Sequence, residues 1–66
     1  MIIIYRNSCE PQIEKSFDTV TSFHKNALFY RIAGITTQEQ CNEWELKQFQ
    51  NDVDDGMILS FRIKEK

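Results

Sequence analysis

Apolar and polar side chains alternate most regularly near the C-terminal end of the chain. The apolar series there consists of Met57, Leu59, Phe61 and Ile63, and three of the four intervening or following positions are polar or charged. A period of two is typical of a strand that has one face buried and the other in solvent. The alternation therefore predicts a half-buried strand over residues 57–64.

The N-terminal residues 1–6 have no such alternation. Three consecutive isoleucines are followed by Tyr5, so both faces of a strand formed here would be apolar. A continuous β-branched run predicts a strand that is buried on both faces and is therefore central in its sheet. The pattern ends before Pro11, which lacks a backbone donor and disfavours helix at the preceding residue.

Residues 13–33 fit two different structures. In the first, a hairpin turns at Lys25 and Asn26, and alternate residues on its two strands share one face of a sheet. In the second, a helix carries four side chains on one side, namely Ile13, Phe17, Val20 and His24. The segment 19–22 consists of β-branched and hydroxyl side chains, which are poor helix formers. The pattern therefore favours the hairpin, with a helix over residues 13–27 as the alternative.

The following element is a helix. Thr36 and Glu39 have the spacing of a capping box, in which each side chain accepts from the backbone amide of the other residue. The helical pattern continues to about Gln50, and the polar segment 51–56 ends it. Gly56 closes that segment and is free to adopt a positive φ.

These elements predict an α+β fold in one domain, residues 1–66. We expect a small, mainly antiparallel sheet of three or four strands, with one main helix at about 37–50 covering one face. A chain of 66 residues with 41% hydrophobic side chains is too short for a second domain. The longest apolar run, residues 1–5, is far below the roughly 20 residues of a membrane span, and it does not resemble a secretory signal. A cytoplasmic location is therefore expected.

The residue types offer little for catalysis or for binding cofactors or metals. His24 is the single histidine, and its spacing from Cys9 and Cys41 matches no metal-ligand motif. The acidic segment 52–56 fails the ligand spacing of a calcium loop, and the two glycines form no phosphate-binding motif. We expect no enzyme activity, no cofactor and no metal. The two cysteines are expected to be thiols, with a single disulfide as the alternative.

Charge is concentrated in residues 36–56. This acidic block holds six carboxylates against Lys47, namely Glu39, Glu43, Glu45, Asp52, Asp54 and Asp55. It is either a solvated face or a surface that attracts a basic partner. Trp44 lies within the block, away from the arc of the helix that holds its apolar residues. Aromatic residues outside a core stripe are enriched among binding hot spots, although Trp44 at the border of the stripe would equally cover a sheet edge.

One helix covers only one face of a sheet, and apolar residues remain for the other face. We expect Val20, Phe29 and Ile58 there, with part of the segment 2–5. An apolar face of this extent would need a partner, either a second copy of the chain or another protein.

The sequence therefore predicts a non-enzymatic protein-binding module that uses Trp44, the acidic block and the apolar sheet face. In length and composition it resembles the short cytosolic accessory proteins of phages and other mobile elements, and such a module would inhibit or modulate a larger host protein. The alternative is a small nucleic-acid-binding or regulatory protein whose basic and aromatic residues interleave at Lys25, Phe29, Tyr30 and Arg31. Eight basic against ten acidic residues argue against that alternative.

Overall fold

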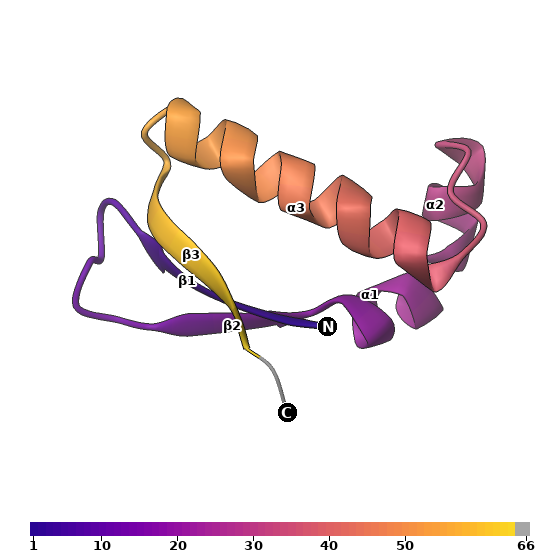
Figure 1. Ribbon diagram of the computed structural model, residues 1–66, viewed down its shortest axis with the longest axis horizontal. Coiled ribbons are helices and arrows are strands. Elements are labelled where there is room, and N and C mark those ends of the chain that lie inside the picture. Colours follow the sequence, from indigo (N-terminus) through magenta and orange to yellow (C-terminus); the bar gives the residue numbers. More distant parts are fainter. Residues whose placement is uncertain (65–66) are drawn as a thin grey trace.

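Three antiparallel strands and three helices make up residues 1–64, the part of the chain that the computed structural model describes (Figure 1). The elements in chain order are β1 (Ile2–Asn7), β2 (Lys15–Asp18), α1 (Thr19–Lys25), α2 (Ala27–Ile32), α3 (Gln38–Asp54) and β3 (Ile58–Lys64). The α+β class is confirmed, and α3 is the main helix. It begins one residue after the predicted start and ends four residues beyond the predicted end.

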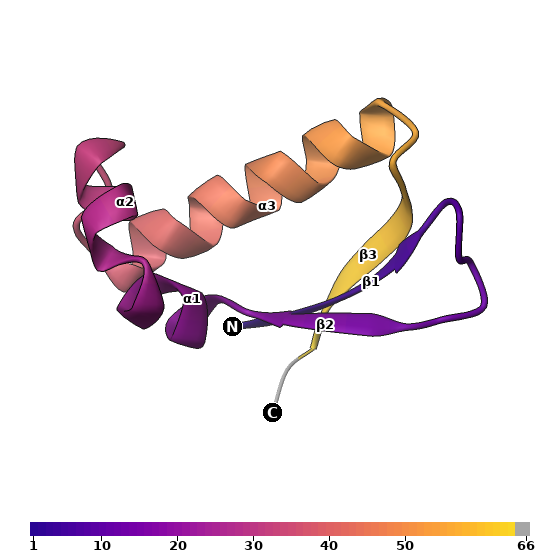
Figure 2. The same cartoon turned by 180° about the vertical axis from the view of Figure 1, so that it is seen from behind.

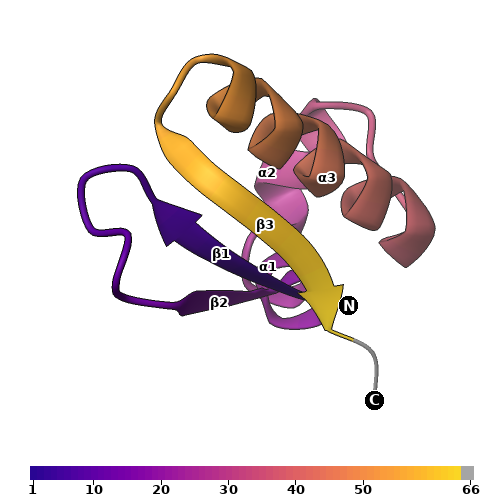
Figure 3. The same ribbon diagram turned by 60° about the vertical axis from the view of Figure 1, so that its left-hand side comes forward.

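The sheet has the strand order β2-β1-β3, so the isoleucine-rich β1 is the central strand, as predicted (Figure 3). The predicted burial of β1 on both faces is wrong, because Ile2 and Ile4 are only half-buried. Ile3 lies opposite Phe17 of β2 and Ile63 of β3 and has no exposed surface. It forms one core cluster with Phe49 of α3 and Ile58 of β3. A single helix therefore covers the face of the sheet to which Ile3 belongs, and the opposite face stays uncovered.

The favoured hairpin at residues 19–32 is wrong, because this segment forms the helices α1 and α2. The Asp18 carboxylate accepts from the amides of Val20 and Thr21 at 3.0 and 3.5 Å, and so caps α1. The helical alternative was also too long, because residues 15–18 form β2. Neighbouring groups decide the structure here, since the cap and the packing of α1 against α3 outweigh the weak helix preference of threonine and valine.

Thr19 joins α1 to the rest of the fold and is completely buried. Its backbone amide donates to the Met1 carbonyl at 2.9 Å. Its hydroxyl lies 3.0 Å from the same carbonyl and 2.6 Å from Asn42 Oδ1 of α3, and its one proton can go to only one of them at a time. The first residue of α1 is thereby held between Met1, which precedes β1, and α3. The helices α1 and α2 lie at the N-terminal end of α3 (Figure 2).

The ends of α3 follow the predicted chemistry with a shift of one residue at the start. Thr37 is the N-cap, and Gln40 completes the capping box instead of Thr36 and Glu39. Gly56 follows the helix with φ +81°, which confirms the predicted positive φ.

The predicted alternation along the last strand matches its burial at Phe61, which packs against the core between the exposed Ser60 and Arg62, but it fails at the start of the strand. Ile58 is only 6% exposed, whereas Met57 and Leu59 are 67% and 54% exposed. The reason is a register shift: Ser60 pairs with Arg6, but Ile58 pairs with Asn7, so Leu59 is an extra residue. A bulge of this kind reverses which residues face the core on its N-terminal side, and so it brings Ile58 under α3.

We expect Ile3→Val to lower the free energy of unfolding by about 0.5–1.5 kcal/mol, because it removes one carbon from a filled core. The matched control is Ile63→Val on the neighbouring strand, since Ile63 lies opposite Ile3 and is 45% exposed. The control should change stability by less than about 0.5 kcal/mol. Urea unfolding measures both, and equal losses would contradict the central position of Ile3.

Candidate functional site

The helix α2 exposes most of its apolar side chains. Leu28, Phe29 and Ile32 are 70%, 55% and 80% exposed, whereas Tyr30 is only 2% exposed. The three exposed residues have the spacing i, i+1 and i+4 and lie within an arc of about 100°. Tyr30 points to the opposite side of α2. The sequence therefore places one aromatic residue inward and an apolar stripe outward, in contact with solvent.

Trp44 of α3 lies beside this stripe. Its ring meets Phe29 at a centroid distance of 5.9 Å and Tyr30 at 5.9 Å, in edge-to-face geometry with interplanar angles of 74° and 90°. The indole is half-buried and packs against the cluster of Tyr30, Ile35 and Cys41, so it does not cover a sheet edge. We call Leu28, Phe29, Ile32 and Trp44 together the α2 surface.

A hollow of about 240 Å³ adjoins Trp44. Its lining comes from α3 and from the segment between α2 and α3, namely Gly34, Ile35, Gln40, Glu43, Trp44 and Lys47. Three of the predicted site residues, Trp44, Glu43 and Phe29, therefore belong to one region of the molecule. Glu43 and Lys47 are exposed and flank the hollow with opposite charges.

Glu45 was predicted to face a partner, but it is buried, with 8% of its surface exposed. The Tyr30 hydroxyl donates to Glu45 Oε1 at 2.7 Å, and the hydroxyl of Ser22 lies 2.7 Å from that of Tyr30. Because the Tyr30 proton goes to the carboxylate, Ser22 is the donor to Tyr30. Burial raises the pKa of Tyr30, and the Glu45 carboxylate raises it further. Burial also raises the pKa of the neighbouring Cys41 thiol.

The remaining acidic residues of the predicted site lie elsewhere. Asp54 is ten residues beyond Trp44, which is about 15 Å along the axis of α3. Asp54 and Asp55 are exposed and Asp52 is partly buried. No basic residue lies in the last turn of α3, so these carboxylates add to the negative end of the helix dipole. They form a second, acidic surface that is separate from the α2 surface.

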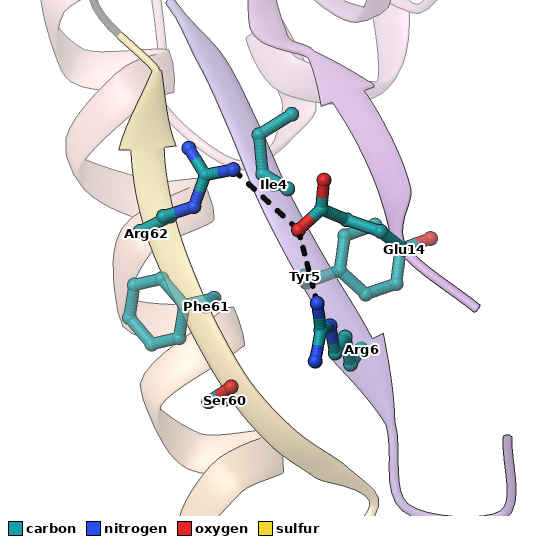
Figure 4. Close-up of a pocket in the computed structure, with 7 residues that line it drawn as sticks. All are labelled: Ile4, Tyr5, Arg6, Glu14, Ser60, Phe61 and Arg62. Atoms are coloured by element: carbon teal, nitrogen blue, oxygen red, sulfur yellow. Dashed lines mark hydrogen bonds and ion pairs between the residues drawn. The ribbon is translucent and has the colours of Figure 1, made fainter. Parts of the chain in front are cut away.

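The uncovered face of the sheet is not the apolar face that was expected. Val20 and Phe29 belong to helices, and Ile58 is buried beneath α3. Of the apolar β1 residues expected there, Ile2 and Ile4 are half-buried, and Arg6 and Arg62 lie beside Ile4 on this face (Figure 4). Large apolar side chains do remain exposed, as expected, but several of them are on α2 and not on the sheet.

Leu28 and Ile32 were missed at the level of sequence. Their spacing with Phe29 indicates an exposed helical stripe only if residues 27–32 are taken as a helix, and the hairpin interpretation concealed it.

Within residues 1–64, no group of three or more His, Cys, Asp or Glu residues is arranged to hold a metal ion. Cys9 is exposed, Cys41 is buried, and both are free thiols. No helix in the described part of the chain has the length and hydrophobicity to cross a membrane. Comparisons with family models, with curated proteins and with solved structures found no match for this chain.

We expect Tyr30→Phe to lower the free energy of unfolding by about 1–3 kcal/mol at pH 7, because the buried Glu45 carboxylate loses its donor. A second readout follows from the raised pKa of Tyr30 in the folded protein. The stability that this group contributes is complete below the ordinary tyrosine pKa of about 10 and declines as the pH rises above it. The decline of stability above pH 10 should therefore be shallower in Tyr30→Phe. Denaturant unfolding at pH 7 to 11 tests this, and identical slopes in the two proteins would refute it.

Proposed function

We propose that this protein is a non-enzymatic binding module that acts by occupying a surface on a larger protein, and that the α2 surface is its contact. The observation that carries the proposal is the exposure of Leu28, Phe29 and Ile32 on a helix of only six residues. An isolated helix of this length is unstable in water, so α2 depends on packing, yet only Tyr30 among its residues is buried. A partner that covers the stripe would supply the missing packing.

The composition of the α2 surface supports the proposal. Tryptophan is enriched among the residues that dominate binding energy, and apolar neighbours exclude water from them. Trp44 is held by Phe29 and Tyr30 in edge-to-face contacts, so little side-chain entropy would be lost when a partner packs on it. The radius of gyration, 12.3 Å, exceeds the roughly 11 Å that is typical of 66 residues, which is in keeping with a fold that leaves apolar surface outside its core.

The charges around the α2 surface have both signs. Arg31 of α2 and Lys47 of α3 are exposed, as is Glu43. A partner with a basic surface would therefore find its counterpart at Asp54 and Asp55, at the other end of α3, and not at Trp44. An extended partner reaching both surfaces would combine apolar contact at one end with steering by charge at the other.

The alternative of nucleic-acid binding loses one of its aromatic residues. Tyr30, which was expected to stack on a base, is 2% exposed, and its hydroxyl is bonded to Glu45. Phe29 is left as the exposed aromatic residue between Lys25 and Arg31. Protein binding is therefore the better supported function. A module that occupies a functional surface in this way would inhibit or modulate the larger protein, as its resemblance to accessory proteins of mobile elements suggests.

The combined substitution Leu28→Gln and Ile32→Gln tests the proposal. Both side chains are largely exposed, so the free energy of unfolding should change by no more than about 0.5 kcal/mol per site. Binding to a partner captured from an extract of the native host, measured by calorimetry, should weaken by about 30-fold or more if these residues form a hot spot. The matched control is Leu59→Gln on β3, where the leucine is 54% exposed and far from α2 in the chain. Equal affinities for the two variants would refute the assignment of the α2 surface.

A second copy of the chain is another partner that the α2 surface would accept. Light scattering at micromolar concentration would then give twice the monomer mass, and Leu28→Gln with Ile32→Gln would return it to the monomer value. A monomer at all concentrations would remove the homodimer and leave the hetero-partner.

A further inference from the structure

We propose that the uncovered face of the sheet carries a phosphate-binding site between Arg6 and Arg62, and that Glu14 occupies this site as an internal competitor. The site is independent of the α2 surface, because its residues lie on β1, on β3 and just before β2. Figure 4 shows the arrangement, in which both guanidinium groups point toward the Glu14 carboxylate.

The two arginines are positioned by neighbouring strands. Arg6 of β1 lies directly opposite Ser60 of β3, and Arg62 lies opposite Ile4. Backbone pairing therefore fixes the separation of the two side chains at their bases. A hollow of about 150 Å³ lies at this place, and its lining consists of Ile4, Tyr5, Arg6, Glu14, Ser60, Phe61 and Arg62. The register shift of β3 occurs immediately beyond Arg6, and bulges are common where a strand must direct a side chain to a site.

Glu14 does not satisfy the two arginines fully. One atom, Oε2, serves both, at 3.5 Å from Nη2 of Arg6 and 3.5 Å from Nη2 of Arg62. A strong charge-assisted hydrogen bond is about 2.7–2.9 Å long, and an arginine facing a good partner forms two of them. Two positive charges also face a single negative one. The group that Glu14 replaces would therefore have more oxygens and more charge than a carboxylate.

A phosphate group has these properties. It carries about −1.5 to −2 charges at pH 7 as a monoester and offers three strong acceptor oxygens. Two oxygens would accept from Arg6 and Arg62, each able to bond through the fork of its guanidinium group. Ser60 lines the same hollow, and its hydroxyl is a further donor for the third oxygen in the proposed site. The class of ligand is therefore a phosphate group.

Glu14 is free to leave without disturbing the sheet. The pairing of β1 with β2 ends at Tyr5 and Lys15, so Glu14 is outside the ladder. Its side chain is 46% exposed, and those of Arg6 and Arg62 are 48% and 61% exposed. Exposed ion pairs are weak, so a better anion would displace the carboxylate.

The test is a titration of the full-length, isotope-labelled protein with inorganic phosphate at constant ionic strength, followed by NMR. Phosphate should shift the backbone signals of Ser60 and the guanidinium signals of Arg6 and Arg62 in a saturable way. Glu14→Gln should tighten binding about 2- to 30-fold, the range that corresponds to losing two competing exposed ion pairs. Adding Arg62→Gln to Glu14→Gln should abolish this gain.

The matched control is Glu10→Gln, which removes the same charge from the same connecting segment. Glu10 pairs instead with Lys15, at 3.5 Å between Oε1 and Nζ. Its substitution should leave phosphate affinity within twofold of the wild-type value. Equal tightening by Glu10→Gln and Glu14→Gln would show a general charge effect and overturn the site. A parallel titration with acetate should give weaker binding than phosphate, and acetate binding as tightly would overturn the choice of phosphate. The absence of saturable shifts in Glu14→Gln would overturn the proposal altogether.

Discussion

The whole structure depends on one helix that must close two cores. Toward its C-terminal half, α3 places Phe49 on Ile3 and Ile58, and so covers one face of the sheet. Near its N-terminal end the same helix places Cys41 against Tyr30 and Ile35, and so holds α2. The described residues 1–64 contain no second long helix to share these tasks. Each surface that α3 does not reach is therefore left to solvent or to a partner.

Two such surfaces differ in chemistry. On α2, apolar side chains remain exposed beside a tryptophan that is held firmly in place, which favours contact with another protein. On the sheet, α3 covers one face, and the other holds Arg6 and Arg62 around a shared carboxylate oxygen. The first surface depends on shape and desolvation, and the second on charge. The two proposed binding sites are therefore separate, and neither requires the other.

The buried polar groups give the smaller core a definite arrangement. Ser22, Tyr30 and Glu45 form a chain of hydrogen bonds that crosses from α1 through α2 to α3. An unpaired carboxylate would be costly in this position, so the three helices must meet in the observed alignment. As a result Glu45 is buried and does not belong to the acidic surface, and the Tyr30 side chain points into the core. The outward direction of Leu28, Phe29 and Ile32 follows from it, because they lie on the other side of a six-residue helix.

Local chemistry by itself determined the central strand, the main helix and the turn at Gly56. The isoleucine run, the capping residues and the glycine act through near neighbours in the chain, so their patterns can be recognised without tertiary contacts. Only the tertiary structure decided the rest. Residues 19–32 became helices because α3 packs against α1, which adds to the local cap from Asp18 and outweighs the local preference for strand. The bulge at Leu59 reversed the burial at the start of β3, since pairing with β1 decides which side chains face α3. Glu45 is turned inward because its carboxylate accepts from Tyr30, which is fifteen residues away in the chain. Arg6 and Arg62 lie near one another because β1 pairs with β3, a strand from the other end of the chain. No window of sequence contains such pairs. For that reason the arginine site and the exposed stripe on α2 emerged only from the fold, whereas Trp44 and Phe29 could be predicted from the sequence.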